Sequence, residues 1–333
     1  MKKAAFLVVL LLISAGIFEP SFVQTAARAS NKEEAPERTL RLLRYTPRSA
    51  VQTRVWQNQV REKLFSVLKL NPAIHPPLSA RVVASSQIGN FTAHTVEINS
   101  TPGRRIQIRV TIPAEHGARL PAVICIPGHG LNKFQVYFRP QYHRVPTILA
   151  SSGYITVSVD VAQHEVFEKG QTLMGERIRD LMRAVDYIRA MPEADATRIG
   201  AAGLSLGGEM SMWLGAMDTR VAAVASSGFL TKMDQLEKNH CPCWKVQGLR
   251  ELVDFSDIYS LIAPRPLLCQ NGQKESPTGF TIPIAKQAFS EIVPVFDALG
   301  SLDQAILVGH DGGHEIDAPS LLEFFKENLN SSD

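Results

Sequence analysis

The stretch RIGAAGLSLGGEMSMW, residues 198–213, joins an apolar run to a second apolar run through a serine that stands between glycines. The first run, 198–204, is typical of a buried strand, and the second is typical of a helix. Ser205 therefore falls on a strand-to-helix turn, with Gly203 and Gly207 where larger side chains would crowd it. Such a serine is typical of a nucleophile, because the helix N-terminus favours a developing anion. An ordinary glycine-rich connection would use the same residues. The surrounding sequence pattern must therefore distinguish a nucleophile from such a connection.

From residue 120 onward, apolar runs alternate with helical stretches. Fully apolar strands in such alternation predict an α/β fold with a mostly parallel central sheet and helices on both faces. The predicted strands are residues 121–127, 154–160, 198–204, 220–227, 264–272 and 304–310. The predicted helices are residues 176–191, 209–217, 283–300 and 318–329.

The residues before this alternation predict a lead-in region. Within 30–118, apolar residues at helical spacing predict a helix over 55–70, and three strand-like runs predict an antiparallel lead-in sheet. The stretch 227–262 breaks the later alternation and is predicted to be a cap insertion near the strand ends. The full chain has 45% hydrophobic residues, and the segment 30–333 suits one large α/β domain.

Residues 1–29 predict a secretory signal peptide. Lys2 and Lys3 precede a short apolar run, and Ala27 and Ala29 supply the small residues of a cleavage site after Ala29. The run is short for a membrane span, so the expected location is secreted or periplasmic, with no membrane attachment after cleavage.

The charge of the chain argues against a nucleic-acid partner. The formal net charge is +3, of which residues 1–29 contribute +2 from Lys2, Lys3 and Arg28 against Glu19, leaving +1. No basic stripe accompanies this near-neutral balance, so binding to nucleic acid is not expected.

The four cysteines fall into two kinds. Cys125 and Cys269 lie in strand-like apolar runs and are interpreted as small buried hydrophobic residues. Cys241 and Cys243 are too close for an unstrained disulfide with each other. With His240 they suggest a metal site, but a fourth ligand at a sensible spacing is missing. We therefore interpret them as structural loop residues and expect no metal.

A serine nucleophile needs a base, and His314 is the candidate. It lies in HDGGHEIDAP, residues 310–319, after the last predicted strand and before the final helix. This gives the chain order Ser, acid, His that is typical of a nucleophile elbow in an α/β sheet. His310 is the alternative, although it still belongs to the strand end.

The base needs an acidic partner that fixes its tautomer. Glu275 lies in the loop after the penultimate strand, where that partner is expected. Asp234, after the preceding strand, is the alternative. Asp297 and Asp303 fall within and just beyond the following helix and are poorly placed.

A tetrahedral intermediate needs two N–H donors. One is expected from the backbone of Leu206, directly after the serine, and the other from His129 or Gly130 in the loop CIPGHGLNKF, residues 125–134. Trp213, Trp244 and Phe280 are aromatic and near the site in sequence, but are interpreted as buried core residues.

The chain resembles the α/β-hydrolase superfamily, and more closely its branch of acetyl-xylan-esterase and dienelactone-hydrolase-like bacterial esterases. The resemblance implies an α/β-hydrolase fold, hydrolysis of small acyl esters that are often acetyl groups on carbohydrates, and no cofactor. It also implies Ser205 as nucleophile, His314 as base and Glu275 as acid. The matching segments are residues 55–68, 121–133, 197–210, 261–275 and 312–315.

Two residues depart from that group's pattern. Pro127 replaces the first histidine of the usual HGHG motif, and Glu275 replaces the usual aspartate. Because of these departures, a catalytically inactive binding protein is one alternative, although the intact Ser–His pair favours an enzyme. A serine peptidase of the prolyl-oligopeptidase kind shares this catalytic domain and is the other alternative, because fold does not fix the leaving group. The expected partner is a small-molecule or carbohydrate ester.

Overall fold

The computed structural model describes residues 38–114, 119–237 and 240–330. The predicted signal peptide, residues 1–29, lies outside them. No helix within the described ranges is long and apolar enough to cross a membrane.

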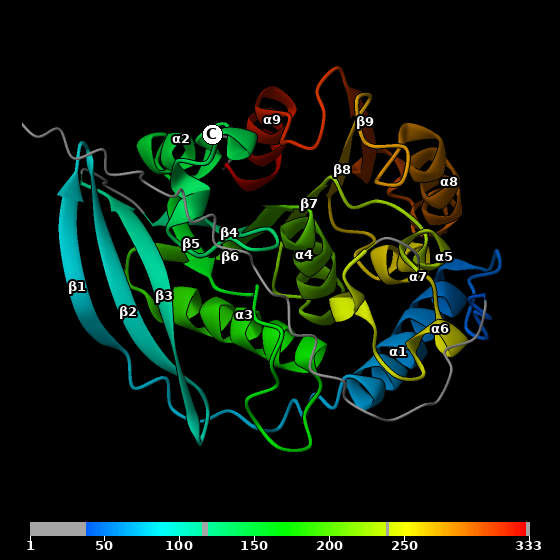
Figure 1. The fold of residues 1–333 in the computed structure, drawn as a ribbon, viewed down its shortest axis with the longest axis horizontal. Helices are drawn as coiled ribbons and strands as arrows, with labels where there is room; N and C mark the ends of the chain where they lie inside the picture. The colour runs from blue at the N-terminus through cyan, green and yellow to red at the C-terminus, as the bar shows by residue number, and fades with distance from the viewer. Residues whose placement is uncertain (1–37, 115–118, 238–239, 331–333) are drawn as a thin grey trace, which may run out of the picture. The chain divides into compact units, whose positions relative to one another are not determined.

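A single nine-stranded sheet forms the centre of the domain, in the order β1-β2-β3-β5-β4-β6-β7-β8-β9 (Figure 1). Strands β4 to β9 pair in parallel, whereas β1, β2 and β3 are antiparallel and join the others through an antiparallel β3–β5 pair. The strand bounds are β1 Arg81–Ile88, β2 Phe91–Thr101, β3 Arg104–Pro113, β4 Leu120–Ile126, β5 Ile155–Val159, β6 Ala194–Leu204, β7 Ala223–Ser227, β8 Leu267–Gly272 and β9 Ala305–His310.

The chain changes direction across the sheet between β5 and β6. It leaves β4 for β5 on one side and then crosses to β6 on the other side of β4. In open α/β sheets, ligands bind at the carboxyl ends of the strands beside such a switch point. The loops after β4 and β6 are therefore expected to form a ligand-binding site.

Alternate residues of each buried strand pack into two apolar cores, one on each face of the sheet. Ala122, Ile124 and Ile126 of β4 face one core, and Val123 and Cys125 face the other, as the two-residue period of a strand requires. The first core is covered by α1 Ala50–Val67, α3 Leu173–Ala190, α4 Leu206–Met217, α7 Phe255–Ser260 and α8 Ile282–Ala298, and the second by α2 Val145–Ser151 and α9 Ala318–Leu329. The predicted α/β fold with helices on both faces is confirmed.

The predicted elements recur with shifted ends, and several short helices are additional. The lead-in helix begins at Ala50 instead of residue 55, with Ser49 and Gln52 forming a capping box at its start. The helix α2 was not predicted, because seven residues with a proline at its beginning show little periodicity.

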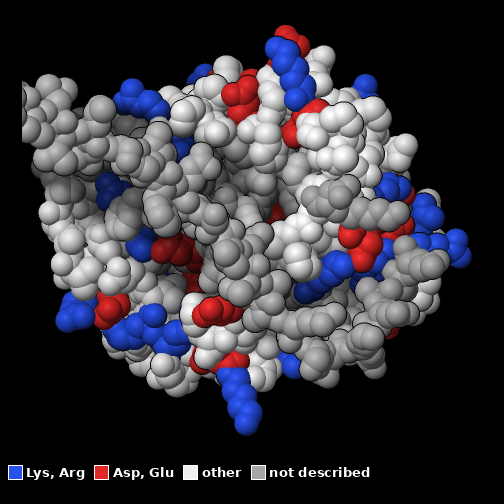
Figure 2. Space-filling view, in the orientation of Figure 1, with Lys and Arg blue, Asp and Glu red and all other residues white. Residues whose placement is uncertain are grey.

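The stretch 227–262 holds several short elements. They are α5 Met233–Leu236, η3 Pro242–Trp244, α6 Leu249–Leu252 and α7. Since α7 packs against α4 and α8, this part of the stretch belongs to the core. The cap role of the stretch stays a prediction. The remaining short helices are η1 Gln135–Tyr137, η2 Pro140–Tyr142 and η4 Leu302–Gln304. On the face drawn in Figure 2, basic and acidic side chains are interspersed.

Candidate active site at the carboxyl ends of the parallel strands

Ser205 occupies the turn between β6 and α4 in a strained backbone conformation. Its φ is 61° and its ψ is −122°, which a residue with a side chain rarely adopts. The turn is held from the neighbouring strand, because the Ser205 N–H donates to the Ser227 carbonyl at 2.9 Å. The Ser205 carbonyl accepts from the Glu209 N–H, which begins the hydrogen bonding of α4. The strain is therefore localised at the candidate nucleophile.

The two glycines that flank Ser205 have no room for a side chain. A Cβ on Gly203 would lie 2.5 Å from the Gly207 backbone, and one on Gly207 would lie 2.3 Å from the Ile126 carbonyl oxygen. Both obstacles are backbone atoms and cannot rotate away. The turn thus closes against β4 only because both residues are glycine.

The change Gly207→Ala should lower the free energy of unfolding by about 3 kcal/mol or more, because the added methyl overpacks a backbone contact. Thermal or denaturant unfolding measures this loss. Gly103→Ala is the matched control, since a Cβ there meets no atom within 4 Å, and it should change stability by less than about 0.5 kcal/mol. Equal stability of the two variants would contradict the prediction.

His314 and Glu275 form a hydrogen-bonded pair. The His314 Nδ1 and the Glu275 Oε1 are 2.7 Å apart, although the residues are 39 positions apart in the chain. Glu275 follows β8 and His314 follows β9, so pairing of those strands brings the two loops together. The Glu275 side chain is only 4% exposed and that of His314 is 40% exposed. A buried acid and an accessible imidazole are what an orienting acid and a base require.

The imidazole of His314 lies beside the turn that carries Ser205. A Cβ on Gly228 would lie 3.0 Å from the His314 Cε1, and Gly228 directly follows Ser227, whose carbonyl binds the Ser205 N–H. The ring of Phe280 stacks on His314 with a centroid distance of 5.5 Å and an interplanar angle of 19°. Within the described residues, no hydrogen bond joins the Ser205 hydroxyl to His314; such bonds are often long before substrate binds.

The alternatives for base and acid are engaged elsewhere. The Nδ1 of His310 accepts from the Gly312 N–H at 3.2 Å. Asp234 receives hydrogen bonds from Thr39 and, at 2.6 Å, from Arg250. The geometry therefore favours Glu275 over Asp234 as the partner of His314.

The candidate N–H donors lie on either side of Ser205. Leu206 is the first residue of α4, where a backbone N–H has no partner within the helix. On the β4 side, an ideal Cβ placed on Gly128 would lie 3.7 Å from the Ser205 Cβ. The Gly128 N–H donates to the Tyr142 hydroxyl at 2.6 Å. The N–H groups of His129 and Gly130 bind no described residue and remain the candidates.

Beneath Ser205, α4 carries the buried carboxyl group of Glu209. Burial raises the pKa of Glu209 to about 7, and the positive charge of Arg177 on α3 offsets part of this shift. Neither residue is more than 3% exposed, and the Glu209 Oε1 has no hydrogen-bond partner among the described residues.

The folded-state pKa of Glu209 lies above its unfolded value, so its contribution to stability is present below about pH 4.5 and is lost as pH rises through about 7. Glu209→Gln should therefore gain stability relative to the parent protein between pH 5 and pH 8, by at most about 3 kcal/mol. Denaturant unfolding at both pH values measures the gain. Glu62→Gln, on the exposed side of α1, should show none. Parallel pH profiles for Glu209→Gln and the parent would contradict the prediction.

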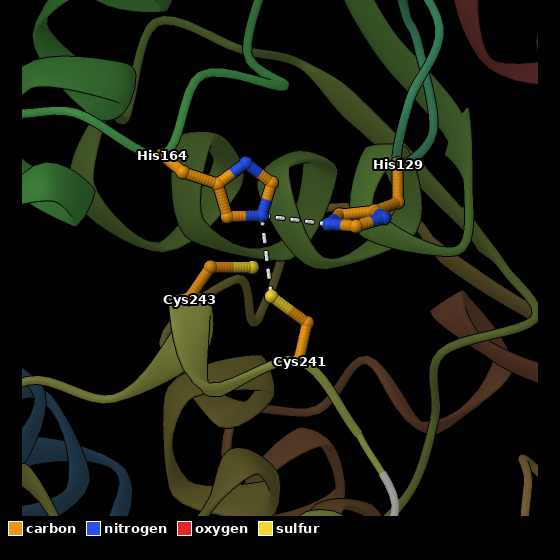
Figure 3. A group of neighbouring side chains, drawn as sticks. All are labelled: His129, His164, Cys241 and Cys243. Carbon is orange, nitrogen blue, oxygen red and sulfur yellow. Dashed lines mark hydrogen bonds between the residues drawn. The ribbon is translucent and has the colours of Figure 1, made fainter. Parts of the chain in front are cut away.

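A second group of side chains lies beside the candidate site. His129 follows β4, His164 follows β5, and Cys241 and Cys243 flank the start of η3; Figure 3 shows the four side chains pointing toward one another. His240 is placed differently, with its ring packed edge-on against Phe280 at a centroid distance of 5.6 Å. The sequence interpretation set a metal site aside because no fourth ligand stands at a sensible spacing from the two cysteines. The structure brings two further candidate ligands, His129 and His164, to the cysteines from the ends of other strands.

The other two cysteines and the three aromatic residues singled out in the sequence are buried, and one of the aromatic residues contacts the site. Cys125 and Cys269 are buried and free, as predicted. Trp213 and Trp244 are at most 2% exposed and belong to the core. Phe280 is also buried, but its stacking on His314 makes it part of the site. No sequence pattern indicated this contact.

A cavity of about 650 Å³ opens at the same edge of the sheet, near the beginning of β3 and the end of β5. In the strand order, this cavity and β6 lie on opposite sides of β4. The residues that follow Gly130 form part of the cavity wall. Charged side chains of both signs line it: Arg104, Arg105, Lys133, Asp160, Glu168 and Asp180.

Two family models match the chain over this region. The model of the abhydrolase family matches residues 42–173, and the model of the prolyl oligopeptidase family matches residues 140–248, which include Ser205. The chain has the α/β-hydrolase fold. The fold that the sequence predicted is thereby confirmed.

Known proteins similar to this α/β-hydrolase include named hydrolases and esterases. The protein YtaP of Bacillus subtilis (strain 168), named as a hydrolase, is 28% identical over 222 residues, covering 58% of this chain and 73% of YtaP. A Bacteroides fragilis NCTC 9343 structure named as an acetyl xylan esterase has a TM-score of 0.67 and 18% identity, covering 88% of this chain and 87% of the other. A glucuronoyl esterase from Solibacter usitatus has a TM-score of 0.66 and 16% identity, covering 90% of this chain and 99% of the other. At such identities these structures establish the likeness of fold.

Proposed function

We propose that this α/β-hydrolase is an exported serine carboxylesterase that removes small acyl groups, acetyl above all, from carbohydrates. The observation that carries the proposal is the 2.7 Å pair of His314 and Glu275 beside the strained turn of Ser205. The relatives named as esterases support the same class of reaction.

In the proposed mechanism, the Ser205 Oγ attacks the ester carbonyl carbon while His314 accepts the hydroxyl proton. Glu275 holds the imidazole in the required tautomer and stabilises the imidazolium that forms. The backbone N–H groups of Leu206 and of His129 or Gly130 stabilise the oxyanion. The tetrahedral intermediate expels the alcohol, which receives the proton from His314, and an acyl-Ser205 ester remains.

Water completes the cycle. His314 removes a proton from the water as its oxygen attacks the acyl-enzyme, and a second oxyanion forms at the same N–H donors. Its collapse breaks the bond to the Ser205 Oγ, which regains a proton from His314. The carboxylic acid is released, and no other reactant is consumed.

The cavity beside β3 and β5 supports a carbohydrate as the alcohol part of the ester. Its wall is continuous with the residues that follow the candidate N–H donors. Most of its charged side chains pair with one another, as Lys133 does with Asp160, and their remaining donor and acceptor positions can bind hydroxyl groups. Export is proposed from residues 1–29 of the sequence. N-terminal sequencing of the exported protein should therefore begin at Ser30.

The deciding experiment compares four substrate classes with one purified protein. We expect turnover of p-nitrophenyl acetate and of acetylated xylo-oligosaccharides, each above the background set by Ser205→Ala. A methyl ester of a glucuronic acid tests the neighbouring esterase class, and a prolyl p-nitroanilide tests the peptidase class that the prolyl oligopeptidase family model raises. Turnover of the anilide alone would replace the esterase proposal, and turnover of none would indicate an inactive binding protein.

A further inference from the structure

Four metal-binding atoms converge beside the candidate active site. The ligand atoms of His129, His164, Cys241 and Cys243 all lie within 4.8 Å of one another. The Nε2 atoms of the two histidines are 2.8 Å apart, and the His164 Nε2 is 3.2 Å from the Cys241 Sγ. The two imidazoles thus point nitrogen to nitrogen, and both thiols point at the same space (Figure 3).

The number, type and spacing of these donors match a tetrahedral zinc site. Zinc in structural sites takes four ligands, and two cysteines with two histidines are a common set. With zinc–nitrogen bonds of about 2.0 Å and zinc–sulfur bonds of about 2.3 Å, the donor atoms of such a site lie roughly 3.3–3.8 Å apart. The observed separations bracket that range, so small side-chain rotations are enough to reach it.

The surroundings of the four side chains are consistent with thiolate ligands. All four cysteines of the chain are free, and Cys241 and Cys243 are separated by one residue, which opposes an unstrained disulfide between them. The guanidinium of Arg177 is close enough to act electrostatically on both His129 and Cys243. Its buried Nε and Nη1 have no hydrogen-bond partner among the described residues, and metal-bound thiolates would accept from such donors.

We propose that His129, His164, Cys241 and Cys243 bind one zinc ion. Since all four positions around the metal are taken by protein side chains, the ion has a structural role and holds no water for catalysis. The two histidines are exposed and the cysteines are half-buried, so the ion reaches the site from solvent.

The zinc ion would join three loops that the sequence keeps far apart. It connects the loop after β4 to the loop after β5 and to η3. His129 is the residue after Gly128, whose backbone lies against Ser205. A metal bond at the His129 side chain therefore fixes the backbone N–H that is a candidate oxyanion donor. This positioning role, unlike the metal binding itself, rests on the proposed esterase function.

Metal binding is tested first on the purified, reduced protein. Elemental analysis should find one equivalent of zinc after incubation with zinc and desalting. Replacement of zinc by cobalt(II) should give the intense visible absorption of tetrahedral cobalt together with a thiolate charge-transfer band. These readings use the parent chain, so they do not depend on whether a variant folds.

The variants assign the metal to the four side chains. The double change Cys241→Ser with Cys243→Ser, and separately His164→Ala, should abolish binding of the equivalent of zinc. His240→Ala and Cys269→Ala are matched controls, because they remove the neighbouring histidine and a distant buried thiol, and both should retain the metal. Failure of the reduced parent protein to bind zinc would overturn the proposal. Undiminished binding by the double cysteine variant would overturn it too, because the metal would then lie elsewhere.

A separate measurement addresses the positioning role. Removal of zinc by a chelator should lower kcat for p-nitrophenyl acetate by about 10- to 100-fold, the usual cost of losing support around a site, and added zinc should restore it. Full activity of the metal-free protein would overturn this role. Ser205→Ala should bind zinc normally although it lacks esterase activity. A zinc-loaded parent protein without esterase activity would overturn the proposed function and leave the metal site standing.

Discussion

Replacing Ser205 by alanine should reduce the turnover of p-nitrophenyl acetate by about 10⁴- to 10⁶-fold, to the level of background hydrolysis. The reason is that the proposed reaction forms and breaks a covalent bond at the Ser205 Oγ, and no other group can replace that atom. The N–H donors stay in place and would leave only a small residual rate. Initial rates over a range of substrate concentrations measure the effect.

The same change should leave the fold intact. The structural bonds of Ser205 are made by its backbone, which alanine retains, so the melting temperature should stay within a few degrees of the parent. Ser211→Ala is the matched control, because it removes a buried hydroxyl from α4. That hydroxyl binds only the Gly207 carbonyl. It should cost less than about tenfold in rate, as a structural hydrogen bond contributes only about 1 kcal/mol. Comparable losses in the two variants would show that a disturbed helix, and not a missing nucleophile, explains the result.

The fold was predictable because its signals are local. Each strand of the parallel sheet is a short apolar run bounded by turn residues, and each large helix has an amphipathic or apolar run of its own. The turn at Ser205 was equally readable, since Gly203 and Gly207 mark a backbone approach that no other residue permits. The helix α2 escaped this reasoning, because a seven-residue helix shows too little periodicity.

The candidate site was only partly predictable, because much of it depends on contacts across the sheet. Glu275 and His314 could be selected from the order of the elements. Phe280 could not, because its stacking on His314 depends on how two loops pack. His164 could be connected with the cysteines only once the strand order placed the loops after β4 and β5 beside each other. A search for histidines at the carboxyl ends of neighbouring strands would have found it.

The second large effect is expected at Glu275. The change Glu275→Gln should lower kcat/KM by about 10³- to 10⁴-fold, because an amide can turn its NH₂ toward the His314 Nδ1 and hold the imidazole in the wrong tautomer. Glu275→Asp keeps the charge but withdraws the carboxylate by one methylene from a contact that is now 2.7 Å long. A displacement of about 1 Å costs roughly 100-fold, so the aspartate variant should fall between the glutamine variant and the parent.

Asp234→Asn separates this role from a general effect of removing a carboxylate. Asp234 lies in α5, which follows the neighbouring strand β7, and is bonded to Arg250 and Thr39. Its loss should therefore cost about 1 kcal/mol of stability and less than a twofold change in kcat/KM. If Asp234→Asn instead reduces kcat/KM more than Glu275→Gln does, His314 must exchange its partner when substrate binds. We expect kcat/KM to be lowest for Glu275→Gln, intermediate for Glu275→Asp and close to the parent value for Asp234→Asn. This order is expected only if the carboxylate of Glu275 itself orients the base. It would also show that a glutamate can serve as the orienting acid in this chain.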